Sequence, residues 1–193
     1  MLRRLYDWTM AQAVTPHALW TLAAVAFIES SVFPIPPDVL IIPMVLAARE
    51  RAWRIAFVCT AASVVGGYAG YAIGMFLFDQ AARPLLAFYG YLDEFAHFRG
   101  LYNEWGAWIV FGAGVTPFPY KVVTIASGLT GLNPVVFGIA SVLARGLRFF
   151  VVAALLWRFG SPIRALIEAH LNKLATLFFI LLIGGFLAIR FLA

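Results

Sequence analysis

Apolar residues run along this chain in long blocks that are interrupted more by prolines and glycines than by polar loops. The blocks at 55–78, 135–157 and 174–192 are each close to the roughly 20 residues that an α-helix needs to cross a bilayer. Each therefore predicts a transmembrane helix. The segment 1–17 mixes arginine with leucine and tryptophan, which predicts a short helix lying on the membrane surface.

Two further apolar blocks, at 18–48 and 105–132, each contain a proline-rich break between two short apolar pieces. Each piece is too short to span, and proline removes a backbone donor, so each block predicts a re-entrant hairpin that returns to its own side. The more polar segment 79–104 between them is predicted to lie at the interface. The helix-breaking prolines are Pro34, Pro36, Pro37, Pro117 and Pro119.

The two breaks read as copies of each other. "SVFPIPPDVLIIP", from Ser31, aligns without a gap on "GVTPFPYKVVTIA", from Gly114, and Asp38 then stands where Lys121 stands. Each hairpin is followed by a span, so the second copy enters the membrane from the opposite side. The predicted fold class is an all-α polytopic membrane protein. Its domain 18–157 is an inverted repeat of hairpin plus transmembrane helix, and 158–193 adds a cytoplasmic linker and a C-terminal helix.

Composition agrees with a membrane protein, since 63% of the residues are hydrophobic and only 12% are charged. Basic residues are concentrated in the segments assigned to the N-terminal side, which predicts a cytoplasmic N-terminus. They are not interleaved with aromatic platforms, so nucleic acid is not an expected partner. Cys59 is the only cysteine, and the common ATPase, zincin and esterase motifs are absent. We expect no metal, no cofactor and no enzymatic activity.

Charged residues occur in segments assigned to membrane depth, where an unpaired charge costs about 2.5–3.5 kcal/mol on insertion scales. Glu29 interrupts an apolar run and is a candidate proton carrier or ion-pair partner. Asp38 is a second such acid, although a helix N-cap after the prolines would explain it equally well. Lys121 can line a polar cavity or extend toward the interface. Arg145 and Arg148 share one helical face and can present two forks to a phosphate or to the two acids.

A stripe of small residues runs along the first predicted span. Gly66, Gly70 and Gly74 recur at four-residue spacing, the pattern that lets a second helix approach closely. The second helix can belong to the same chain or to another copy, so a homo-oligomer stays open.

Both proline-broken segments resemble signatures of a known family. "FIESSVFPIPPDVLIIP" resembles the first signature of the DedA membrane proteins, also called VTT or SNARE-associated Golgi proteins. "GAGVTPFPYKVVTIASGLTGLNPVVF" resembles the second, most closely in the YqaA-type bacterial subgroup. The resemblance covers roughly 18–157 and implies two facing hairpins in the bacterial cytoplasmic (inner) membrane. It also implies lipid movement between leaflets, with undecaprenyl phosphate recycling in bacteria, phospholipid scrambling in eukaryotic relatives, and dependence on the proton-motive force.

The resemblance assigns roles to the charged residues. Glu29 and Asp38 match the membrane acids of the family and are the predicted proton-coupling residues. Many members carry two arginines around a proline in the second signature, whereas this chain has only Lys121 there. We therefore hypothesise that Arg145 and Arg148 join Lys121 in binding the substrate phosphate.

The predicted function is translocation of a phosphate-bearing lipid, with undecaprenyl phosphate as the expected substrate and protons as the expected coupling ion. The expected partners are membrane lipids and protons. An energy-independent phospholipid scramblase is the alternative. A membrane-embedded lipid-modifying enzyme is disfavoured, because the nearby hydroxyls of Thr116, Tyr120, Thr124 and Ser127 have no evident base beside them.

Overall fold

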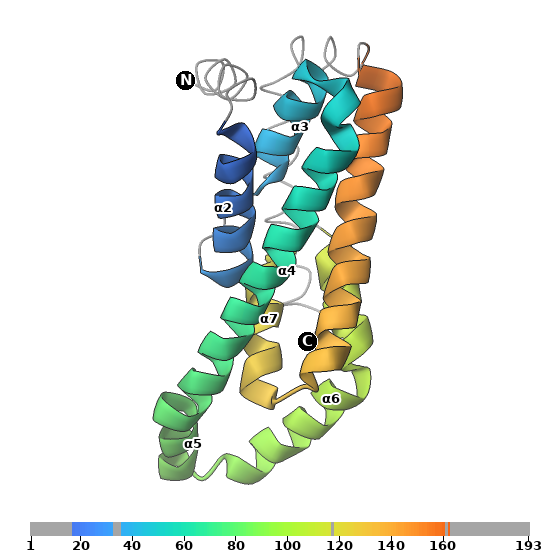
Figure 1. Cartoon of the computed structure of the whole chain (residues 1–193). Coiled ribbons are helices and arrows are strands. Elements are labelled where there is room, and N and C mark those ends of the chain that lie inside the picture. The colour runs from blue at the N-terminus through green and yellow to red at the C-terminus, as the bar shows by residue number, and fades with distance from the viewer. Residues whose placement is uncertain (1–16, 33–35, 117, 161, 163–193) are drawn as a thin grey trace.

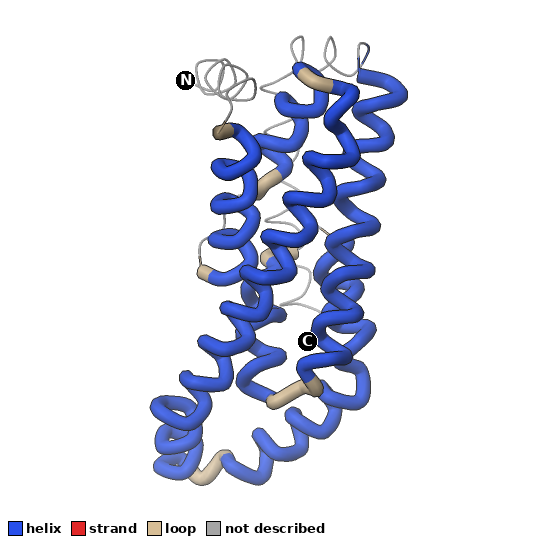
Figure 2. The backbone as a smooth tube through the Cα atoms, in the orientation of Figure 1, coloured by secondary structure: helices blue, strands red, loops and turns tan. Residues whose placement is uncertain are grey.

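The structure is a computed structural model that describes residues 17–32, 36–116, 118–160 and 162. Over these residues the chain is helical with short connections and contains no strand (Figures 1 and 2). This confirms the all-α prediction. The predicted surface helix at 1–17, apart from its last residue, and the predicted helix at 174–192 lie outside the described residues.

Two of the helices are long and apolar enough to cross a membrane. One is the continuous stretch Arg49–Tyr89, and the other is Pro134–Gly160. They contain the spans predicted at 55–78 and 135–157. The helices in chain order are α2 (Ala18–Ser31), α3 (Asp38–Ala47), a 3-10 turn (Arg49–Arg51), α4 (Ala52–Leu77), a π-helical turn (Phe78–Ala82), α5 (Arg83–Tyr89), α6 (Leu92–Val115), α7 (Tyr120–Thr130) and the Pro134–Gly160 helix.

Two hairpins, α2 with α3 and α6 with α7, lie at opposite ends of the two membrane-length helices. In Figure 1, α2 descends and α3 returns upward beside the upper half of α4, whereas α6 rises and α7 descends at the lower half. The ends of the two hairpins therefore face each other near the middle of the molecule. The contact of α7 with both α4 and α2 places the second hairpin directly against the first.

Prolines set the starts of both returning helices, as the sequence predicts. Pro37 precedes α3 with a φ of −66°, and its carbonyl accepts the first bonds of the helix, from Leu40 N at 2.9 Å and Ile41 N at 3.0 Å. Pro119 precedes α7 with a φ of −61°. Proline suits such starts because its φ is already fixed and its missing N–H would be unpaired there anyway. Pro36 also lies in the first break, and Pro34 and Pro117 lie outside the described residues.

The boundaries predicted for the interfacial segment 79–104 are wrong. The helix that contains the first span continues to Tyr89, and the chain turns at Gly90, whose φ of 76° is left-handed. From Leu92, α6 then runs unbroken to Val115, so the first arm of the second hairpin begins at Leu92 and not at residue 105. The sequence becomes more polar here, but a change in polarity alone does not end a helix. Helices end where the backbone is interrupted, for example by glycine or proline.

Two apolar cores lie one above the other along the long helices. The upper core joins α2, α3 and the start of α4 to the end of the Pro134–Gly160 helix, through residues such as Leu22, Ile41, Cys59 and Phe149. The lower core joins α6 and α7 to the other ends of the same long helices, through residues such as Tyr71, Val110, Tyr120 and Phe137. The buried polar residues of the two long helices fall between these two cores in sequence; they are Thr60, Ser63, Ser141 and Arg145.

The glycine stripe of α4 contacts other helices of the same chain. A Cβ atom on Gly66 would collide with the backbone of Phe27 in α2, and one on Gly74 would collide with the carbonyl of Ile125 in α7. Gly70 faces both the Ser30 carbonyl and the Thr124 side chain. The prediction that this stripe contacts a helix of the same chain is therefore confirmed. Both hairpins pack so closely against α4 that their backbones approach its glycines directly.

Candidate functional site

The tertiary structure brings all five charged residues predicted for the site to the level where the hairpins meet. Glu29 comes from α2, Asp38 from the start of α3 and Lys121 from the start of α7, while Arg145 and Arg148 come from the Pro134–Gly160 helix. Arg145 Nη2 lies 2.5 Å from Glu29 Oε2, and Arg148 Nη2 lies 2.6 Å from Asp38 Oδ2. Each arginine thus pairs with one acid, in agreement with the hypothesis that the arginines form ion pairs within the protein.

The Glu29–Arg145 pair is buried and closed into a ring of hydrogen bonds. Arg145 Nε donates to Ser63 Oγ at 2.6 Å, Ser63 and Ser30 share a bond of 2.7 Å, and Ser30 Oγ donates to Glu29 Oε2 at 3.0 Å. Because an arginine can only donate, the proton of Ser63 is left to bind Ser30. The ring therefore has one direction, with two donors ending on the same ionised carboxylate oxygen, Glu29 Oε2.

Aromatic rings enclose the same guanidinium. The Arg145 Cζ atom lies 4.7 Å from the centroids of both the Tyr120 and the Phe149 rings, a distance at which a cation and a π face attract. The Tyr120 hydroxyl is in turn bonded to Ser141. Only 1% of the Arg145 side chain is exposed. Its surroundings leave no open side from which a phosphate could approach.

The Asp38–Arg148 pair is more open and bridges both hairpins. The exposed fractions of the two side chains are 23% for Asp38 and 17% for Arg148. Arg148 Nη1 also donates to the carbonyl of Thr116 at 2.6 Å, at the end of α6. The N-cap interpretation of Asp38 is wrong, because Pro37 holds the N-cap position and Asp38 lies inside the first turn, with its carboxylate on Arg148.

Lys121 makes the reciprocal contact from the second hairpin to the first. Its Nζ donates to the carbonyl of Val32 at 3.0 Å, and Val32 is the C-cap of α2. Thr116 is likewise the C-cap of α6. Each cation therefore lies at the negative end of a helix dipole, which stabilises positive charge there. Lys121 reaches across to the other hairpin and does not extend along its own helix.

The sequence did not predict Ser30 and Ser63 as residues of the site, and it indicated Thr124 only as a nearby hydroxyl without a base. Ser30 and Ser63 complete the ring around Arg145, and Thr124 Oγ1 donates to the Ser30 carbonyl at 3.0 Å, joining α7 to α2. The available signal is weak, since serine and threonine are common in apolar helices. Only the proximity of Ser30 to Glu29 in the sequence could have suggested a role.

We expect Ser63→Ala to lower the free energy of unfolding by about 1–3 kcal/mol, because it leaves the Nε of Arg145 without its acceptor inside the protein. Thr60→Val is the matched control, since the Thr60 hydroxyl bonds only to the Ala56 carbonyl of its own helix. Chemical unfolding in detergent, followed by circular dichroism, measures both. Equal stability losses in the two variants would contradict the role given to Ser63.

These observations define a class: a helical protein with two membrane-length helices and two proline-broken hairpins that meet at a layer of ion pairs. The sequence is 38% identical over 168 residues to an uncharacterized protein of Haemophilus influenzae, covering 85% of this chain and 87% of that one. It is 34% identical, with the same coverage, to a Histophilus somni protein described as an uncharacterized HI0703 homolog. The chain belongs to the family of these two proteins. No protein-family model and no solved structure matches it.

Proposed function

We propose that this protein is a DedA-like membrane transporter that moves a phosphate-bearing lipid, undecaprenyl phosphate in our proposal, between the leaflets of the bacterial inner membrane. One observation carries the proposal. Two cations from the second half of the chain, Lys121 and Arg148, meet Asp38 and the end of α2 where the hairpins face each other. Such a partly open, cationic position between two helix breaks is the usual place for an anionic substrate in transporters built from repeats.

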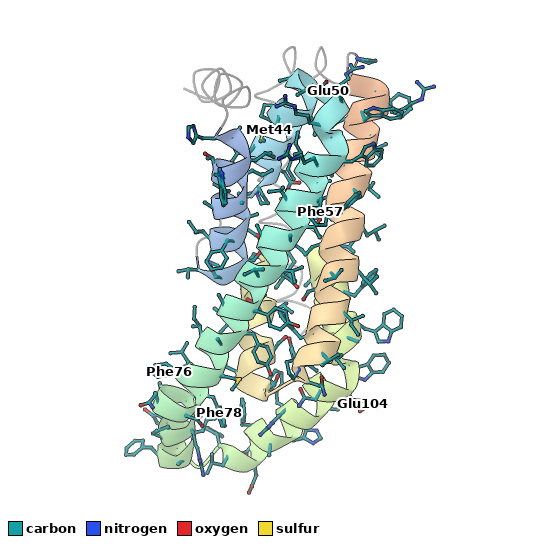
Figure 3. All side chains as sticks on the ribbon, in the orientation of Figure 1. Met44, Glu50, Phe57, Phe76, Phe78 and Glu104 are labelled. Atoms are coloured by element: carbon teal, nitrogen blue, oxygen red, sulfur yellow. The ribbon has the colours of Figure 1, made fainter. Side chains whose placement is uncertain are left out.

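The surface of the molecule supports a membrane environment. Large apolar side chains are exposed along both membrane-length helices, among them Phe57 at 64% and Leu143 at 59%. The 41-residue stretch Arg49–Tyr89 is about 60 Å long, twice a hydrocarbon core of about 30 Å. One end must then lie outside the core, and we assign this to the lower end that follows Phe76 and Phe78 (Figure 3).

The opposed hairpins support the proposed inverted repeat and, with the distribution of basic residues, a cytoplasmic N-terminus. In this arrangement the headgroup enters the polar layer and the lipid tails stay in the bilayer. No tunnel wide enough for the whole lipid is required.

The geometry favours a smaller phosphate site than the sequence suggested. Arg145 was predicted to bind phosphate, but its guanidinium is enclosed by Glu29, Ser63 and two aromatic rings. We assign direct phosphate binding to Lys121 and Arg148 only. Arginine suits this role because its planar fork donates two parallel bonds to a phosphate, while the lysine adds a compact second charge.

The two acids are the proposed proton-coupling residues. A proton on Asp38 would remove the negative charge from the partner of Arg148 and free that guanidinium for a headgroup. A proton on Glu29 would likewise remove the negative charge from the partner of Arg145, although that guanidinium stays enclosed. An energy-independent scramblase would use the same polar layer without any protonation step.

The hydroxyl groups of the site favour transport over chemistry. The Ser127 hydroxyl is bonded to the Tyr102 hydroxyl at 3.0 Å, and Thr124 donates to the backbone carbonyls of Ser30 and Lys121. A nucleophilic hydroxyl needs an adjacent base, and these partners are neutral. We therefore favour both transport hypotheses over a lipid-modifying enzyme.

We expect the double variant Lys121→Gln with Arg148→Gln to reduce movement of labelled undecaprenyl phosphate in proteoliposomes by about tenfold or more, since it removes both proposed phosphate ligands. The matched control, Arg83→Gln with Arg158→Gln, removes two positive charges outside the polar layer and should retain transport. Labelled phosphatidylethanolamine, with and without a pH gradient, completes the assay.

The outcomes separate the hypotheses. Selective movement of undecaprenyl phosphate that responds to the gradient and is lost in Glu29→Gln supports the coupled transporter. Equal movement of both lipids without a gradient identifies a scramblase. No movement of either lipid by the wild-type protein overturns the proposal.

A further inference from the structure

Both terminal nitrogens of Arg148 hold partners within the protein. Nη2 donates to the Asp38 carboxylate at 2.6 Å, and Nη1 donates to the Thr116 carbonyl, also at 2.6 Å. These bonds use two of the five N–H donors of the guanidinium. A phosphate that binds both terminal nitrogens in parallel therefore competes with these two partners.

The carboxylate is the partner whose chemistry matches a phosphate. Asp38 is an anion held by one ion pair, and 23% of its side chain is exposed, so the pair is open to solvent or headgroup. The Glu29–Arg145 pair is its opposite in every respect: it is buried, closed into the serine ring and covered by two aromatic rings. Exchange of anions is thus restricted to Arg148.

We propose that Asp38 is a built-in competitor of the anionic headgroup: its carboxylate occupies Arg148 when the site is empty and yields that guanidinium to a phosphate when substrate enters. This inference rests on the proposed function and adds its regulation. Asp38 would weaken substrate binding, but between transport cycles it would balance the positive charge of Arg148.

Charge balance explains why such a competitor is useful. Lys121, Arg145 and Arg148 together carry one more positive charge than Glu29 and Asp38 carry negative. A phosphate monoester carries about −1.5 to −2 charges at neutral pH, so its charge exceeds the single excess positive charge of the layer while Asp38 is ionised. Without Asp38 the layer would hold two uncompensated positive charges, would attract any anion more strongly, and would release it more slowly.

The test uses the full-length protein in phosphatidylcholine nanodiscs and measures binding of farnesyl phosphate by equilibrium dialysis, with empty nanodiscs correcting for partition into lipid. We expect Asp38→Asn to bind the probe about fivefold more tightly than the wild type, the scale of one partly exposed charge pair. Glu50→Gln is the matched control, because it removes one negative charge at the upper end of the molecule, far from the hairpin tips (Figure 3). It should leave binding unchanged.

Binding by Asp38→Asn that is equal to or weaker than that of the wild type overturns the competitor role, while loss of binding in Arg148→Gln would still support the proposed function. Absence of binding to both the wild type and Asp38→Asn overturns both proposals. Asp38→Ser replaces Asp38→Asn if the latter does not fold, with the same expectation. Inorganic phosphate serves as the second probe. Tight binding of farnesyl phosphate alone identifies the ligand of the site as a lipid, and equal binding of both probes identifies it as free phosphate.

Discussion

Replacing Arg145 with Met is expected to lower the free energy of unfolding by about 3–5 kcal/mol, the cost of leaving one member of a buried ion pair without its partner. The Glu29 carboxyl group would lose its cationic partner in a site where only 10% of its side chain is exposed. Ser63 would lose the donor at its oxygen, and the rings of Tyr120 and Phe149 would lose the cation between them. Chemical unfolding in detergent, followed by circular dichroism, measures the loss.

Two further variants separate two effects on stability: the loss of the ion-pair partner and the change in side-chain volume. Arg145→Met combined with Glu29→Leu replaces the whole pair with apolar groups and is expected to recover most of the stability, because such replacements are often neutral or better. Arg148→Met makes the same substitution in the more open pair, with side chains 17% and 23% exposed, and is expected to cost about 1 kcal/mol or less. Equal losses at Arg145 and Arg148 would show that burial does not distinguish the two pairs.

Gly74→Ala is expected to destabilise the protein by about 1–3 kcal/mol, because the added methyl group would collide with the Ile125 carbonyl of α7. Neither backbone can move freely, since Gly128 of α7 packs in turn against the Tyr71 carbonyl of α4. The second hairpin would be pushed away from α4, so the lipid movement that we propose should fall together with stability.

Gly112→Ala provides the control for the same chemical change. Gly112 lies inside α6, and a Cβ atom there has no neighbouring atom within 4 Å. Alanine favours the helix over glycine by roughly 0.5–1 kcal/mol, so this variant should be as stable as the wild type or more so. Thermal unfolding of both variants in the same detergent gives the comparison. A Gly74→Ala protein as stable as Gly112→Ala would contradict the close approach of α4 and α7.

Local features of the sequence were sufficient to predict the elements. The apolar blocks predict where helices lie, and Pro37 and Pro119 begin their helices because proline fixes φ and lacks a donor. The two hairpins and both membrane-length helices were therefore predicted. The error at 79–104 has the same origin, because polarity was taken as a boundary where only Gly90 interrupts the helices.

The site was predicted as a set of residues but not as an arrangement. Buried charges are rare and conspicuous, so Glu29, Asp38, Lys121, Arg145 and Arg148 could all be identified from an apolar sequence. Their spacing allowed either a shared phosphate site or internal pairs. Only tertiary packing chose the pairs, because Glu29 and Arg145 are 116 residues apart and meet where α2, α4 and the Pro134–Gly160 helix converge.

The sequence by itself determined which segments are helical, where they break and which charges must find partners, since these depend on the chemistry of neighbouring residues. The tertiary structure alone decided which charge is enclosed and which stays open to a ligand. That distinction depends on Ser63, Tyr120 and Phe149, whose distances from Arg145 are set by helix packing. No local pattern encodes those distances.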